Sequence, residues 1–109
     1  MDLLKMINQN DMAAAQQLYK DLQKKYSQYI GENQLRMFGQ SLHNAKRLEE
    51  AEKIFQLNLK AYPSSSQCFV DLAEVYHSMG NVTSAMYYCR KALELEPENM
   101  YAQFLFKSL

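Results

Sequence analysis

The order of apolar and polar residues follows the period of an α-helix along almost the whole chain. Apolar residues recur three and four positions apart, and no stretch alternates apolar and polar residues over the length of a strand. Only three glycines and two prolines interrupt this pattern. The pattern predicts an all-α chain of about seven helices, over residues 2–8, 11–28, 32–44, 47–61, 65–79, 82–95 and 98–108.

The chain also contains an internal repeat. Pro63 and Pro97 lie 34 residues apart, and a shift by this distance brings further residues of similar size or polarity into register. These aligned pairs are Leu35 with Phe69, Phe38 with Leu72, Gly39 with Ala73, Leu42 with Tyr76, His43 with His77, Ala51 with Ala85 and Phe55 with Cys89. The shared spacing predicts two copies of one helix hairpin.

The second copy has the clearer turn signals. Gly80 supplies the positive φ that ends a first helix, and Asn81 can cap the second one. Pro97 then ends the unit, because proline cannot continue a helix interior. The apolar and small positions of this copy read Phe69-x-x-Leu72-Ala73-x-x-Tyr76 and Ala85-x-x-x-Cys89-x-x-Ala92.

This pattern resembles the tetratricopeptide repeat (TPR), whose motif W-x2-L-G-x2-Y…A-x3-F…P has the same period. The first copy departs from it at Lys46, where glycine is usual, and at Asn58, where alanine is usual. The resemblance implies a right-handed superhelical stack of TPR helix hairpins in a single domain over 1–109. It has about two full repeats, 32–63 and 66–97, with a partial first repeat over 1–28 and a C-terminal helix over 98–109.

A narrower resemblance concerns residues 34–109. The phrases at 57–63 and 93–99 are similar to the C-terminal repeat tail of some bacterial serine hydrolases, both α/β-hydrolase and β-lactamase-like. This alternative implies an accessory or dimerisation tail that contacts its own parent catalytic domain. It also implies a periplasmic location if the parent is exported. The start of the chain shows no secretory signal, which favours the cytoplasm instead.

The balance of charges, the length of the apolar runs and the number of cysteines each argue against a class of function. Twelve basic residues balance twelve acidic ones, so the chain lacks the positive footprint of a nucleic-acid or anionic-membrane binder. No apolar run approaches the roughly 20 residues that span a bilayer. Cys68 and Cys89 are predicted to be buried free thiols rather than a disulfide framework.

The residues needed for catalysis are missing from the sequence. No G-x-S-x-G occurs, and the serines at 64–66 are expected to cap a helix. Glu74 and His77 have the spacing of a di-iron half-site, but the equivalent of Glu74 in the other copy is Gln40. No C-x-x-C, H-E-x-x-H or glycine-rich phosphate loop occurs. We therefore expect no enzyme activity, no metal and no cofactor.

The first helices of such a stack line its concave surface. The helical spacing predicts a polar groove there, with Asn44, Val70 and Ser78 on the same inward face, formed by Asn33, Arg36, Gln40, His43, Gln67, Asp71, Glu74 and His77. This groove either binds an extended peptide or helix, or is a solvated face without a ligand. The negative charge of Asp71 argues against a clamp for C-terminal carboxylates. A further hypothesis is a regulatory site for a small ligand, but the groove is too polar to favour it.

The last helix carries a second candidate surface. Ala102, Phe106 and Leu109 share one face and can cover the preceding repeat, while a further group of apolar residues lies elsewhere on the helix. We call this group the docking patch: Tyr101, Phe104 and Leu105. It docks on a twin subunit or another domain, or it is a modest exposed patch. We therefore expect a non-catalytic protein–protein interaction scaffold, with the docking patch as the first surface to test.

Overall fold

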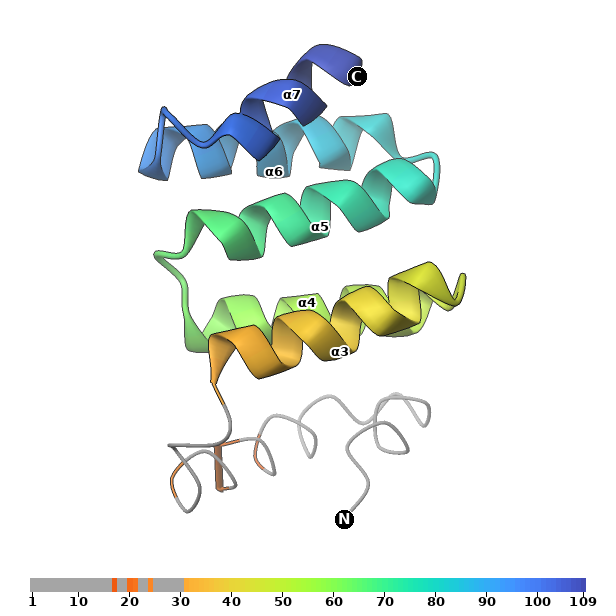
Figure 1. The fold of residues 1–109 in the computed structure, drawn as a ribbon, viewed down its shortest axis with the longest axis vertical. Coiled ribbons are helices and arrows are strands. Elements are labelled where there is room, and N and C mark those ends of the chain that lie inside the picture. The colour runs from red at the N-terminus through yellow and green to blue at the C-terminus, as the bar shows by residue number, and fades with distance from the viewer. Residues whose placement is uncertain (1–16, 18–19, 22–23, 25–30) are drawn as a thin grey trace.

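The computed structural model describes residues 17, 20, 21, 24 and 31–109 (Figure 1). Residues 31–109 form helices without a strand: α3 (Glu32–Asn44), α4 (Leu48–Ala61), α5 (Ser66–Ser78), α6 (Val82–Leu95) and α7 (Met100–Ser108). This confirms the all-α prediction. The predicted helices 2–8 and 11–28 fall almost wholly outside the described residues, so the partial first repeat stays a prediction.

The helices form two layers. Figure 1 shows α3, α5 and α7 in the front layer, with α4 and α6 behind them. Each helix contacts the next one along the chain, and α5 also contacts both α3 and α7. Helices α3 and α6 have the predicted bounds, whereas α7 begins at Met100, two residues after the predicted start. The front layer therefore presents one continuous face built from three first helices.

The turns between paired helices keep one geometry in both repeats. Gly80 has φ 81°, and the Asn81 side chain accepts a hydrogen bond from the Ser84 N–H at 3.1 Å. Lys46 stands 34 residues before Gly80 and has φ 65°. A lysine in the left-handed region costs on the order of 1 kcal/mol. The repeat thus keeps its turn geometry at a position where its usual glycine is missing.

Small and large residues alternate where paired helices cross. Phe55 of α4 is buried against Gly39 of α3, where an added Cβ would lie 2.3 Å from the ring carbon Cε1. The equivalent positions in the second repeat hold Ala73 and Cys89, both fully buried. A larger residue on one helix is therefore matched by a smaller one on the other, which keeps the two crossings filled.

One residue predicted beside the groove belongs to the core instead. Val70 is fully buried, and it packs in a cluster with Ala92 of α6 and Ala102 of α7. The prediction for Val70 was wrong because α7 covers this side of α5. Helical spacing alone assigns a residue to a face, but the next helix of the stack decides whether that face is open.

Candidate functional site

An ion pair links α3 and α5, two neighbouring helices of the front layer. The Arg36 guanidinium donates from Nε to Asp71 Oδ2 at 2.8 Å, and the Asp71 side chain is only 1% exposed. Gln67 Nε2 donates to the other carboxylate oxygen at 3.3 Å. Burial raises the pKa of Asp71, and the hydrogen bond from Arg36 opposes that rise. This arrangement makes Asp71 a structural link between α3 and α5 rather than a free group in the groove.

A second polar contact crosses the same two helices near their C-terminal ends. His43 Nε2 lies 2.7 Å from Ser78 Oγ. Burial lowers the pKa of His43, and the nearby Lys46 charge lowers it further. The lowered pKa favours the neutral imidazole, which can share one hydrogen bond with the serine hydroxyl. Together with the ion pair, this contact fixes the spacing of α3 and α5.

Glu74 of α5 lies between these two contacts but takes part in neither of them. Its side chain is half-buried, yet its carboxylate makes no hydrogen bond to the described part of the chain. Burial raises the pKa of Glu74, the Asp71 carboxylate adds to the rise, and the Arg36 charge opposes it. A partly desolvated acid without a partner costs free energy that a bound donor or cation would recover.

The docking patch and the groove meet in one depression of about 420 Å³. It is lined by His43, Glu74, His77, Ser78, Tyr101, Phe104, Leu105 and Ser108. A neighbouring depression shares Glu74 and Tyr101 and continues toward Arg36. Helical spacing predicted the docking patch and the groove as two separate surfaces. In the structure α7 lies beside α5, so the two surfaces are continuous.

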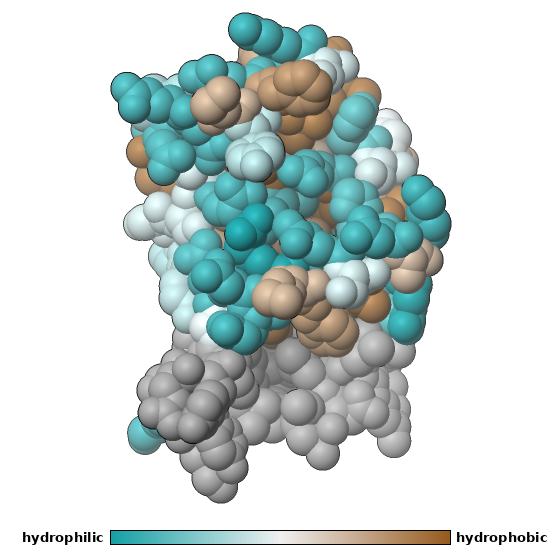
Figure 2. Space-filling model, in the orientation of Figure 1, coloured by the Kyte–Doolittle hydropathy of each residue, from teal (hydrophilic) through white to brown (hydrophobic). Residues whose placement is uncertain are grey.

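Polarity changes along this face. Figure 2 shows hydrophilic side chains over the middle of the front layer, and hydrophobic ones both toward the α7 end and at the α3 end. Tyr101 and Phe104 are 72% and 76% exposed, which is high for large apolar side chains. Asn33, Gln40 and His77 are also exposed, while Arg36 and Gln67 are half-buried. Ser108, which sequence reasoning missed, lies 34 residues after Glu74, so the repeat register was the signal for it.

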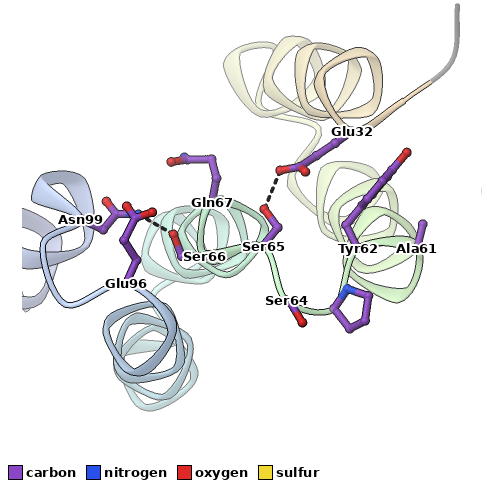
Figure 3. A pocket seen from close by; sticks show the side chains of 10 residues that line it. Glu32, Ala61, Tyr62, Ser64, Ser65, Ser66, Gln67, Glu96 and Asn99 are labelled. Carbon is purple, nitrogen blue, oxygen red and sulfur yellow. Dashed lines mark hydrogen bonds between the residues drawn. The ribbon is translucent and has the colours of Figure 1, made fainter. Parts of the chain in front are cut away.

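A polar pocket of about 640 Å³ lies along the edge of the front layer where α3 and α5 begin and beside the turn before α7 (Figure 3). There Ser65 Oγ donates to the Glu32 carboxylate, and Asn99 Nδ2 donates to Ser66 Oγ at 2.9 Å. Ser65 and Asn99 are 34 residues apart, so the same type of link recurs between successive repeats. Ser65 also accepts from the Cys68 N–H, which confirms the predicted cap. These serine hydroxyls link neighbouring helices of the stack.

The described residues carry no metal cluster and no membrane span. Within the described residues, no group of three or more His, Cys, Asp or Glu side chains is arranged to hold a metal ion. No helix in that part of the chain is long and apolar enough to cross a membrane. Cys68 and Cys89 are buried free thiols, as predicted.

Residues 66–99 match the family model of the tetratricopeptide repeat. This segment is therefore similar to a single TPR. The match covers α5, α6 and the turn before α7, two residues beyond the predicted repeat 66–97. TPRs generally bind protein partners and are typically non-catalytic, so the chain has the kind of fold used in protein-interaction scaffolds. No curated protein matches the chain. Nothing in the TPR match supports the likeness to hydrolase tails, which stays a prediction.

Proposed function

We propose that this chain is a non-catalytic protein-binding module whose partner lies across α5 and α7 on the concave face. The supporting observation is the depression in which the exposed rings of Tyr101 and Phe104 stand beside the half-buried Glu74. Large aromatic side chains next to a polar group are typical of the residues that dominate binding energy at interfaces.

The polar contacts of the rest of the face support this role, because they join its helices to one another. The Arg36–Asp71 ion pair and the His43–Ser78 contact join α3 to α5 before any partner arrives. A preformed surface binds more tightly because less conformational freedom is lost on association. The polar groups of the groove therefore position the aromatic end, rather than contacting the partner throughout.

Two other uses of the docking patch stay predictions: contact with a twin subunit and contact with a parent catalytic domain. Sedimentation equilibrium of the chain tests the first use. A concentration-dependent dimer that Phe104→Ser abolishes is the expected result for that use, and a monomer at high concentration would contradict it.

Selection from a displayed library of random short peptides tests the binding proposal. Peptides selected on the full chain are expected to lose binding on Phe104→Ser. The matched control is Tyr87→Ser, because Tyr87 is 52% exposed on α6, which belongs to the other layer. Circular dichroism establishes that both variants are folded. Peptides that bind Phe104→Ser as well as the wild type, or a selection that yields no binder, would refute the proposal.

A further inference from the structure

We infer, resting on the proposed function, that the bound partner segment places a lysine or arginine side chain against Glu74, between Tyr101 and Phe104. The structure thereby assigns the site a chemical preference: a basic side chain with an apolar stem. The first reason is charge. Among the eight residues that line the depression, Glu74 is the only Asp, Glu, Lys or Arg.

The charges around Glu74 compensate its own charge only in part, because Arg36 lowers the pKa of Glu74 while burial and the Asp71 carboxylate raise it. Asp71, the nearby acid, is already paired with Arg36 through the 2.8 Å contact. The shortest hydrogen bond of Arg36 therefore goes to the Asp71 carboxylate and not to Glu74. Glu74 keeps its half-buried carboxylate without a hydrogen bond to the described residues. A cationic ligand group would supply both the missing donor and the missing charge.

The aromatic rings give the second, independent reason. Tyr101 and Phe104 line the same depression as Glu74 and are among the most exposed large apolar side chains of the described residues. A lysine or arginine head is attracted to the face of such rings. The aliphatic stem of either side chain can cover the rings while the head reaches a carboxylate. An acidic side chain would satisfy neither feature, and a purely apolar one would leave Glu74 buried without a partner.

The peptides selected on the chain supply the probes for a test. Each lysine or arginine of a selected peptide is replaced in turn by norleucine, which keeps the stem and removes the charge. Affinities are measured by fluorescence anisotropy on the wild type and on Glu74→Gln. Glu49→Gln is the matched control for net charge, because Glu49 is exposed on α4 in the other layer.

One basic position is expected to matter more than the others. Its replacement, or Glu74→Gln, weakens binding about five- to tenfold, and the two changes together weaken it no further, because they remove the same contact. Glu49→Gln leaves affinity unchanged. Peptides that depend on Phe104 but show no basic preference, or equal losses on Glu74→Gln and Glu49→Gln, would overturn the inference and leave the proposed function standing. Peptides insensitive to Phe104→Ser would instead refute the proposed function.

Discussion

Gly39 of α3 faces the ring of Phe55 in α4, and we predict that Gly39→Ala destabilises the chain. An added Cβ would lie 2.3 Å from Cε1 and 2.8 Å from both Cδ1 and Cζ. Carbon atoms pack best at about 3.5–4.0 Å, so the ring would have to move by more than about 1 Å. Overpacking a core in this way costs about 2–3 kcal/mol. Alanine returns about 1 kcal/mol through its higher helix propensity, which leaves a net loss of about 1–2 kcal/mol.

A double-mutant cycle with Phe55→Leu separates these two effects. Leucine lacks the Cε1 and Cζ atoms that crowd the new methyl group. In that background Gly39→Ala is expected to stabilise the chain by about 0.5–1 kcal/mol, which gives a coupling energy of about 2 kcal/mol. Urea unfolding followed by circular dichroism measures all four variants. The equivalent position of the second repeat supplies the control, where Ala73→Gly is expected to cost about 1 kcal/mol. Equal effects of Gly39→Ala in both Phe55 backgrounds would refute the reasoning.

Three further predictions concern the Arg36–Asp71 ion pair, the positive-φ turn residues Lys46 and Gly80, and the Cys68 thiol. Arg36→Val or Asp71→Leu alone is expected to lower the free energy of unfolding in urea by about 2–3 kcal/mol, because each change leaves one partner of the ion pair without the other. The double variant introduces the apolar residues that stand 34 positions later, and its free energy of unfolding is expected to stay within about 1 kcal/mol of the wild type. Lys46→Gly is expected to raise stability by about 0.5–1 kcal/mol and Gly80→Lys to lower it by about 1 kcal/mol, because both positions have positive φ; equal thermal midpoints for the two variants would contradict this. Burial raises the pKa of Cys68 from 9.0 to about 12, so the unfolded chain releases this proton first and stability falls as pH rises from 9 to 12; Cys68→Ala is expected to show a smaller alkaline loss, and an identical pH profile would refute the assignment.

Much of the fold could be predicted from sequence, because helix ends depend on local chemistry. Asn81 caps α6 as predicted, and Asn99 caps α7 with the same side-chain geometry. Gly80 has the expected positive φ. These signals lie within a few residues of the structure that they specify, so no knowledge of tertiary contacts is needed to use them.

The candidate site was less predictable, because it depends on which helices become neighbours. Helical spacing placed Asp71 on the groove face, but only the contact between α3 and α5 shows that Arg36 pairs with it. Val70 lies on a nearby part of α5 and is covered by Ala102 of α7. The sequence also treated Phe104 as part of a separate surface, whereas it lines one depression with Glu74. The residues of each such contact lie 30 or more positions apart in the sequence, and the periodicity within one helix does not reveal which of them become neighbours.

The most direct test of the account is an amide chemical-shift map of the nitrogen-15-labelled chain, titrated with the tightest selected peptide. The account predicts that the largest shifts fall in α5 and α7, around Glu74 and from Tyr101 to Ser108, with smaller ones near His43 in α3. It also predicts that α4 and the outer side of α6 stay unchanged. Shifts confined to α4 and α6, with none around Phe104, would contradict binding on the concave face.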